Sequence, residues 1–289
     1  MAGKRFIIYC NRDKPHALAF GRELRDWLVG RAQLLADNLD HTLDLARLPA
    51  ADFLLVLGGD GTILSTVRTL GENQLPIIGV NIGRLGFLAE FSIKQFQQNF
   101  ERITNDGHLV SRRVLLCCRF SGPGRPQHQS IAVNELAVIA GPPFRMIEVS
   151  VAIGGEHLAT TAGDGLIIAT PTGSTAYNLS AGGPILEATL PAAVITPLAA
   201  HSLSFRPIVL TLDHPITINC RSYHPAKPAE EPGGMAVIDG QENLPLTSRD
   251  QIEITRATHQ CQLVRNPCQS QWRLLNLKLG WGALPNYEK

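Results

Sequence analysis

Residues 58–62 read Gly-Gly-Asp-Gly-Thr and follow directly on an apolar run at 53–57. The apolar run predicts a buried strand, and the pattern after Thr62 predicts a helix. Glycines at such a turn let the backbone approach a ligand closely, and the start of a helix attracts phosphate groups. Asp60 would repel a phosphate unless it binds a metal or accepts a proton from a hydroxyl that is about to be phosphorylated. The turn therefore predicts phosphoryl transfer, and the alternative is an ordinary helix N-cap.

The composition of the chain narrows the class of protein. Its 289 residues can form one large domain or two ordinary ones, and a hydrophobic content of 44% supports a buried core. A net charge of +1 gives no sign of a nucleic-acid or membrane partner. No apolar run approaches the roughly 18 residues that span a bilayer, and no signal-peptide pattern is seen. The six cysteines lack Cys-x-x-Cys spacing, so we expect reduced thiols in a cytoplasmic protein.

The first 110 residues alternate between strand and helix patterns, which predicts an α/β domain with a parallel sheet over residues 1–110. The expected strands are 5–10, 53–57 and 77–80, and the expected helices are 16–28, 62–70 and 93–103.

The pattern changes near Ser111, where short apolar runs separated by glycine and proline predict a β-sandwich over residues 111–269. Its expected strands are 114–120, 131–140, 147–153, 166–169, 208–212, 216–220, 235–238, 251–255 and 261–264. The stretch 223–234 is expected to be an exposed loop. Helical spacing at 272–279 predicts a terminal helix, within 270–289, that returns to the first domain.

Asn134 and Glu135 interrupt an otherwise apolar strand pattern. Neighbouring strand residues face opposite sides, so at least one of the two should face the protein or a ligand. Their donors and acceptors suit sugar hydroxyls. A bulge or strand end with both side chains in water is the equally weighted alternative.

A second dense segment, residues 163–184, is a strand pattern followed by small hydroxyl residues and a Gly-Gly-Pro stop. Small residues leave room for a flat ring, and hydroxyls can cap a helix or read a base edge. Ser174 is expected to cap the helix, because the Gly-x-Ser-x-Gly nucleophile motif is absent. The chain also lacks the Walker lysine motif and the Gly-x-Gly-x-x-Gly dinucleotide fingerprint.

Taken together, these segments resemble the bacterial ATP-dependent NAD kinases (the polyphosphate/ATP-NAD kinase family). The resemblance covers nearly the whole chain and rests on residues 58–62, 81–88, 134–135, 164–184, 201–208, 239–241 and 278–282. Gly-Gly-Asp-Gly-Thr alone is shared with diacylglycerol and sphingosine kinases and, loosely, with phosphofructokinases. The Thr-Pro-Thr-Gly-Ser-Thr-Ala-Tyr stretch together with the Asn-Glu pair is far more specific.

The resemblance implies a Rossmann-like α/β domain joined to a β-sandwich, with the site between them and completed across a homodimer or homotetramer contact. It implies NAD kinase activity, with ATP and NAD as small-molecule substrates and no nucleic-acid or membrane partner. Asp60 would be the catalytic general base at the 2′-hydroxyl of the adenosine ribose. A divalent metal, magnesium by expectation, would neutralise the phosphates, and no residue is assigned as its ligand.

The resemblance also implies site residues. Those expected at ATP phosphates are Gly58, Gly59, Gly61 and Thr62. Those expected to bind NAD are Asp60, Gly61, Phe87, Asn134, Glu135, Arg145, Ala162, Asp164, Thr175, Ala176, Tyr177, Asn178, Leu179, Ser180, Ala199 and Gln241. Many relatives carry arginine two residues before the residue that matches Asp164, whereas this chain carries Ala162. We hypothesise that losing this cation relaxes discrimination against NADH.

Two other functions stay open on the residues alone. A lipid kinase would share the glycine-aspartate turn, but the Asn-Glu pair and the absence of a basic membrane-facing run disfavour it. A non-catalytic NAD(P) sensor would keep the pocket, but the presence of Asp60 disfavours it. Use of polyphosphate as donor, the size of the oligomer and feedback by NADPH are not determined by the sequence.

Overall fold

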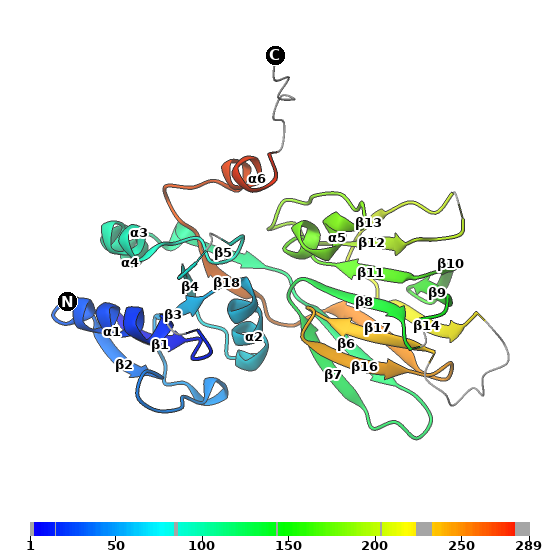
Figure 1. Ribbon diagram of the computed structural model, residues 1–289, viewed down its shortest axis with the longest axis horizontal. Coiled ribbons are helices and arrows are strands. Elements are labelled where there is room, and N and C mark those ends of the chain that lie inside the picture. The colour runs from blue at the N-terminus through cyan, green and yellow to red at the C-terminus, as the bar shows by residue number, and fades with distance from the viewer. Residues whose placement is uncertain are drawn as a thin grey trace, which may run out of the picture. The chain divides into compact units, whose positions relative to one another are not determined.

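The computed structural model describes residues 3–14, 16–83, 86–142, 144–202, 204–223 and 233–280. The chain divides into two compact units (Figure 1). The first unit comprises Met1–Thr66, Leu75–Ser111 and Gln262–Lys289, and the second comprises Val67–Gln74 and Arg112–Cys261.

The first unit is built on a six-stranded sheet with the order β2-β1-β3-β4-β18-β5. The strands are β1 (Arg5–Cys10), β2 (Gln33–Asp37), β3 (Phe53–Gly58), β4 (Ile77–Asn81), β5 (Val110–Arg113) and β18 (Cys261–Val264). Strands β2, β1, β3, β4 and β18 run parallel, which confirms the expected α/β class. The expectation that 261–264 is a sandwich strand is wrong, because Leu263 pairs in parallel with Ile77 of β4.

The helices assigned here are α1 (Ala17–Leu28), α2 (Asp60–Leu70), α3 (Ile93–Gln98), α4 (Phe100–Asn105) and α6 (Gln271–Leu279), with short 3-10 turns η1 (Leu45–Arg47) and η2 (Gly107–Leu109). The unit boundary falls within α2. Residues 93–103 form two helices rather than one, because Asn99 ends α3 and begins α4. Aromatic side chains fill the core: the Phe6 ring stacks on Phe53 with centroids 5.2 Å apart, and Trp27 meets Phe100 edge-on.

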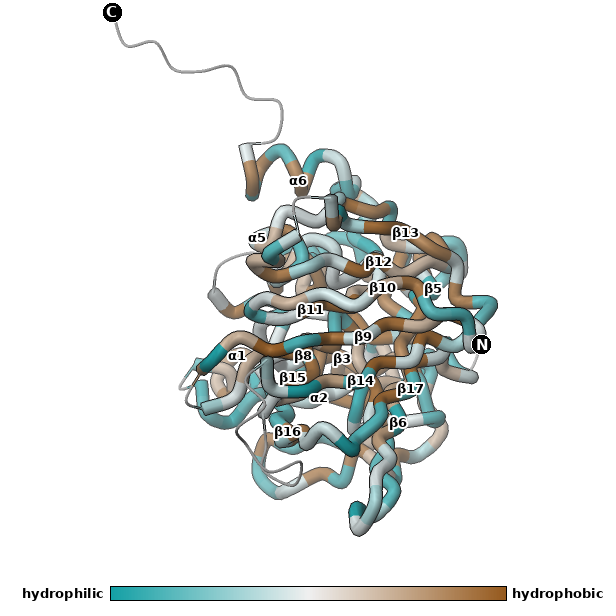
Figure 2. Tube along the Cα trace, turned by 90° about the vertical axis from the view of Figure 1, so that its right-hand side faces the viewer, coloured by the Kyte–Doolittle hydropathy of each residue, from teal (hydrophilic) through white to brown (hydrophobic). Residues whose placement is uncertain are grey.

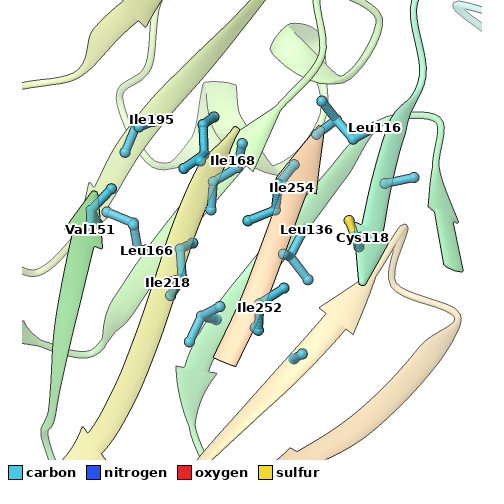
Figure 3. Close-up of a cluster of buried hydrophobic side chains, with 14 of the residues drawn as sticks. Leu116, Cys118, Leu136, Val151, Leu166, Ile168, Ile195, Ile218, Ile252 and Ile254 are labelled. Carbon is cyan, nitrogen blue, oxygen red and sulfur yellow. The ribbon is translucent and has the colours of Figure 1, made fainter. Parts of the chain in front are cut away.

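The second unit contains two six-stranded antiparallel sheets, with orders β10-β9-β14-β17-β6-β7 and β13-β12-β11-β8-β15-β16. Side chains of both sheets share one buried cluster, including Ile218 and Ile254 from the first and Leu166 and Ile195 from the second (Figure 3). This arrangement confirms the expected β-sandwich.

The strands of the first sheet are β6 (Leu116–Ser121), β7 (His128–Ala132), β9 (Ile147–Ile153), β10 (Glu156–Gly163), β14 (Ile216–Ser222) and β17 (Gln251–Arg256). Those of the second are β8 (Glu135–Ala140), β11 (Gly165–Ala169), β12 (Ala192–Leu198), β13 (Ile208–Thr211), β15 (Gly234–Ile238) and β16 (Glu242–Leu246). A 3-10 turn, η3 (Gly173–Thr175), and a short helix, α5 (Tyr177–Ser180), follow β11.

The sequence patterns missed edge strands with little apolar alternation, such as β2, β10 and β16, and also missed β12, a buried strand between β13 and β11 whose run is interrupted by Thr196 and Pro197. Half of the residues of β10 are exposed, so its pattern is polar. In Figure 2 hydrophobic and hydrophilic residues alternate along strands such as β8 and β9. None of the described helices has the length and apolar composition needed to cross a membrane. Most of the expected loop at 223–234 lies outside the described residues, since 224–232 are not described.

Candidate active site

Three loops of the first unit begin where neighbouring parallel strands end. Cys10 of β1 lies opposite Leu57 of β3, and Gly58 of β3 lies opposite Asn81 of β4. The loops that follow these strands therefore share one edge of the sheet. In open α/β sheets this carboxyl edge is where ligands bind. Arg84 and Leu85, which belong to the motif at 81–88, lie outside the described residues.

Asp60 opens α2, and its half-buried carboxylate is held by the loop after β4. Oδ2 accepts a hydrogen bond from the N–H of Phe87 at 2.8 Å, and Oδ1 accepts from Leu88 at 3.0 Å and Ala89 at 3.1 Å. A Cβ on Gly86 would lie 1.9 Å from Oδ1, so this approach requires glycine. A carboxylate has about four lone-pair positions, so three donors leave about one for a ligand.

Thr62, expected at the ATP phosphates, has a buried side chain that braces the turn. Its hydroxyl accepts a hydrogen bond from Nδ2 of Asn11 at 3.1 Å. It also fills the space beneath Gly58, where a Cβ would lie 2.4 Å from Oγ1. The more open positions of the turn are Gly61, which is exposed, and Gly59, which is half-buried. The backbone of these two glycines is therefore the accessible part of the turn.

A cation lies beside that accessible backbone. Nζ of the exposed Lys14 is 3.4 Å from the position that a Cβ would take on Gly59. Lys14 follows β1, so the parallel sheet brings it to the glycine turn although the two are far apart in the chain. A lysine beside the start of a helix adds to the positive potential there.

A pocket of about 280 Å³ lies in the first unit next to the turn. Most of its lining is polar and comes from the segment after β1, from the residues after β2 and from α2: Asn11, Arg12, Asp13, Asn38, Thr42 and Ser65. Thr62 lines it as well, so the pocket opens beside the glycine turn. Its size is near the lower end of typical small-molecule sites.

Phe87, expected at NAD, supplies one of the N–H groups that hold Asp60. Its ring is covered by the ammonium of Lys278 on α6, 4.7 Å from the ring centroid. The motif at 278–282 therefore reaches the Asp60 loop through Lys278, while its residues from 281 onward lie outside the described residues.

In the second unit, three adjacent strands place polar residues at one sheet edge. Ala169 at the end of β11 pairs with Glu135 at the start of β8, and Ile238 at the end of β15 pairs with Leu136. Thr170, Asn134 and Asp239 therefore lie side by side. The expected continuous strand at 131–140 is wrong: β7 ends at Ala132 and β8 begins at Glu135. The Asn-Glu pair stands at a strand end, with Asn134 half-buried and Glu135 buried.

Glu135 is only 6% exposed. Burial, and then the negative charge of Asp239, raises the pKa of Glu135 to about 8, against the hydrogen bond from the N–H of Tyr177. Its Oε2 is buried and has no hydrogen-bond partner among the residues the structure describes. A buried polar atom without a partner is costly, so this oxygen is suited to a ligand hydroxyl.

The segment at 170–184 is held by buried polar side chains. Ser174 does not cap α5, which corrects the expectation; its hydroxyl donates to the Pro171 carbonyl at 2.6 Å and accepts from the Leu186 N–H at 3.0 Å. Asn178 is fully buried and donates to the carbonyls of Ser174 and Pro184. The side chain of Asn178, expected at NAD, is therefore engaged within the protein.

The remaining expected residues fall into two groups. Thr175 and Ala176 precede α5, Leu179 lies within it, and the exposed Tyr177 and Ser180 are its first and last residues. Ala162 and Asp164 flank Gly163, whose missing Cβ would lie 2.9 Å from the carbonyl oxygen of Ala199.

Two further expected residues lie elsewhere in the second unit. Arg145 is exposed on the loop before β9. Gln241 lies in the β15–β16 turn and accepts a hydrogen bond from Arg68 at 2.5 Å.

Sequence reasoning missed Asn11, Lys14 and Arg68, and it named Asp239 only as part of the motif at 239–241, without a role. The Asp239-Gly240 pair reads as a hairpin turn, and Lys14 reads as a surface cation. Only pairing across each sheet brings them to the residues that were found.

The described residues offer few ligands of their own to a divalent metal. Within the described part of the chain, no three His, Cys, Asp or Glu side chains cluster to hold one. Magnesium is commonly held by one or two carboxylates together with substrate phosphates and water. A metal that arrives bound to the ATP phosphates and water needs no such cluster of protein ligands, so the described residues fit it.

A held carboxylate in a glycine-rich turn at a strand-to-helix junction, in a chain that also carries a β-sandwich with a buried Asn-Glu pair, is typical of a phosphotransferase that acts on an alcohol. Family models match the chain in two parts: the ATP-NAD kinase N-terminal domain at residues 32–108 and the ATP-NAD kinase C-terminal domain at residues 133–266. The chain belongs to the ATP-NAD kinase family.

Relatives and solved structures agree with this assignment. The chain is 35% identical over 284 residues to an NAD kinase of Heliobacterium modesticaldum, covering 95% of this chain and 98% of that protein. It is 36% identical to an NAD kinase of Rhodopirellula baltica, covering 96% and 87%. Yeast NADH kinase complexed with NADH superposes with a TM-score of 0.85 at 25% identity, covering 100% of this chain and 90% of that one. An NAD kinase from Archaeoglobus fulgidus in complex with ATP gives 0.71 at 26% identity, covering 94% and 96%.

Proposed function

We propose that this chain transfers the γ-phosphoryl group of ATP to the 2′-hydroxyl of the adenosine ribose of NAD, giving NADP. The observation that carries the mechanism is the Asp60 carboxylate, which three backbone N–H groups hold at the carboxyl edge of the parallel sheet. Phosphoryl transfer asks a protein mainly for alignment and charge neutralisation, and a rigidly held carboxylate supplies alignment.

ATP binds on the side of the glycine turn. The backbone of Gly59 and Gly61 takes its phosphates, with the ammonium of Lys14 beside them. The neighbouring pocket of about 280 Å³ extends this donor site. Magnesium bound to ATP supplies further charge neutralisation. Thr62 and Gly58 shape the turn, and because the Thr62 hydroxyl only accepts from Asn11, its own proton is free to be donated to a phosphate.

Asp60 receives the 2′-hydroxyl at its remaining lone-pair position. The hydroxyl of a ribose is a poor nucleophile, so a carboxylate within hydrogen-bond reach accepts its proton as the bond to phosphorus forms. The three N–H donors keep the carboxylate from rotating away.

Asn134 and Glu135 bind the ribose hydroxyls, and the partnerless Oε2 of Glu135 supports this role. The segment around α5 lines the pocket for the rings of NAD. It contributes Thr175, Ala176, Tyr177, Leu179 and Ser180. Ala162, Asp164 and Ala199, whose backbones lie together, take the nicotinamide end, and Arg145 and Gln241 add peripheral contacts. Because Ala162 brings no cation to that end, we propose that NADH is also accepted.

The setting of the enzyme belongs to the proposal as well. All six cysteines are free, which supports the reducing environment of the cytoplasm. We carry over a homodimer or homotetramer from the family resemblance, to be tested by light scattering coupled to size exclusion.

The reaction is tested with purified protein, ATP, magnesium and NAD, with a dehydrogenase specific for NADP reporting the product. NADH and polyphosphate are run in parallel as acceptor and donor. NADP formation with ATP supports the proposal. Bound NAD without NADP under any donor would favour the sensor function, and absence of NAD binding would reopen the lipid kinase.

A further inference from the structure

We propose that Asp239 is a positioning residue of the acceptor site, whose carboxylate sets the backbone of the Asn134-Glu135 pair. This inference rests on the proposed binding of ribose hydroxyls by that pair. Asp239 touches no substrate in this scheme and acts through the two residues that do.

The carboxylate of Asp239 collects three consecutive backbone N–H groups. Oδ1 accepts from Asn134 at 2.7 Å, Glu135 at 3.1 Å and Val133 at 3.2 Å, and Oδ2 also accepts from Val133 at 3.1 Å. The N–H of Asp239 returns a hydrogen bond of 3.0 Å to the Glu135 carbonyl. Successive N–H groups that converge on one anion form a rigid anion nest, here occupied by the chain's own carboxylate.

Carbonyl groups of the same segment accept hydrogen bonds from Thr170, which directly follows the neighbouring strand β11. The Thr170 hydroxyl donates to the Val133 carbonyl at 2.6 Å, and the Thr170 N–H donates to the Asn134 carbonyl at 2.8 Å. A Cβ on Gly173 would lie 2.1 Å from that Asn134 oxygen, so the approach is close. N–H and C=O groups of the segment at 133–135 are therefore both hydrogen-bonded. This fixes the directions in which the side chains of Asn134 and Glu135 project.

Burying a charged carboxylate in order to satisfy three amide groups has a large desolvation free energy. The Asp239 side chain is 0% exposed, and its charged partner Arg68, which lies in the same unit, is 3.4 Å away and only 18% exposed. Burial raises the pKa of Asp239, against the lowering effects of the three N–H groups and Arg68. A buried ion pair is weak evidence for stability, and one attested use of such a pair is to impose a geometry. Here that geometry is the backbone that carries the ribose-binding pair.

The position of Asp239 suits a conservative variant. Its φ is +49° and that of Gly240 is +64°, and the Gln241 N–H donates to the Ile238 carbonyl, which forms a tight Asp-Gly hairpin turn. Asparagine adopts this left-handed backbone as readily as aspartate. Asp239→Asn therefore keeps the turn, removes the charge and presents an NH2 group toward backbone donors.

We expect Asp239→Asn to raise the KM for NAD about tenfold while kcat at saturating NAD stays within about threefold. Asp250→Asn is the matched control, because Asp250 is also buried, pairs with Arg125 and accepts the Thr247 N–H, on other segments of the unit. The control should lower the melting temperature without changing the KM for NAD. Equal KM increases in both variants would overturn the assignment, since they would reflect general loosening.

A double-mutant cycle separates this inference from the proposed function. Asn134→Ala and Glu135→Gln should each raise the KM for NAD, and in either background the effect of Asp239→Asn should shrink to about threefold or less. A tenfold effect retained in both backgrounds, or no effect of Asp239→Asn alone, would overturn the positioning role and leave the ribose assignment intact. Unchanged KM in both Asn134→Ala and Glu135→Gln would instead overturn the ribose assignment, and the inference with it.

Arg68→Gln is the second variant should Asp239→Asn not fold. Arg68 also donates to the Ile238 carbonyl at 3.5 Å, so its loss loosens the Asp239 turn without removing the carboxylate. We expect a KM increase of about threefold for NAD and none for ATP. An unchanged KM for NAD in a folded Arg68→Gln enzyme would count against the role.

Discussion

The backbone N–H of Asn134 donates a 2.7 Å hydrogen bond to Oδ1 of Asp239, 105 residues further along the chain. The first unit contains a similar arrangement, in which the Asp60 carboxylate accepts hydrogen bonds from the N–H groups of three consecutive residues that begin at Phe87. In each unit, one carboxylate thus organises a loop at the edge of a sheet. Asp60 retains a position for a ligand, whereas Asp239 is wholly buried.

Asp60→Asn should lower kcat by about 10²–10⁴-fold and leave the dissociation constant for NAD within about threefold, since general-base catalysis has this magnitude. The measurement is the coupled NADP assay together with calorimetric NAD titration. Asp106→Asn, which alters a half-buried carboxylate that caps η2, is the control and should retain full turnover. A normal kcat in Asp60→Asn would refute the role of Asp60 as the general base.

Lys14→Met should raise the KM for ATP about tenfold with little change in the KM for NAD, because a charge-assisted contact to phosphate is lost. Steady-state kinetics with each substrate varied in turn measures both constants. Lys4→Met removes an exposed cation of the same unit and should change neither. If Lys14→Met alters only the KM for NAD, the donor site is elsewhere.

Glu135→Gln should change how stability depends on pH. The pKa of Glu135 in the folded chain, about 8, lies above its ordinary value of 4.5, so folding favours its protonated form. Its contribution to stability is fully present below about pH 4.5 and is lost as the pH rises through about 8. From pH 5 to pH 9 the variant should gain stability relative to the parent by up to a few kcal/mol. Urea unfolding at each pH measures this, and parallel pH profiles would contradict it.

Asn178→Ala should destabilise the protein by about 2–4 kcal/mol, because it leaves the carbonyls of Ser174 and Pro184 and the hydroxyl of Thr196 without buried partners. Denaturant unfolding gives the free energy. Asn219→Ala, which removes one hydrogen bond of an exposed asparagine, should cost less than about 1 kcal/mol. If Asn178→Ala had the same free energy of unfolding as the parent, the hydrogen bonds of the Asn178 side chain would not stabilise the fold.

Ala162→Arg should lower kcat/KM for NADH about tenfold relative to NAD, because it restores the residue whose loss, in our hypothesis, relaxes discrimination against NADH. Kinetics with both acceptors give the ratio. Thr160→Arg places the same charge two residues earlier on the same face of β10 and should have a smaller effect. Undetectable turnover of NADH by the parent enzyme would refute the hypothesis behind this prediction.

Local patterns predicted much of the fold. The alternation of strand and helix before Ser111 and the short strands after it led to the right class, because side-chain periodicity reports which face of an element is buried. Edge strands such as β10 were not predicted, since an exposed strand needs no apolar alternation. β18 was assigned to the wrong sheet, because a four-residue apolar run carries no information about its partner.

The sequence by itself determined the glycine turn and Asp60, because a buried strand, three glycines and a helix are contiguous and their conformations are local. It also singled out Asn134 and Glu135, since polar residues within an apolar run must be satisfied. Only the tertiary structure decided what holds these residues. Lys14 reaches Gly59 through the pairing of β1 with β3, and Asp239 reaches Asn134 through the pairing of β15 with β8. Register between strands is set by the packing of whole sheet faces, which no single segment encodes.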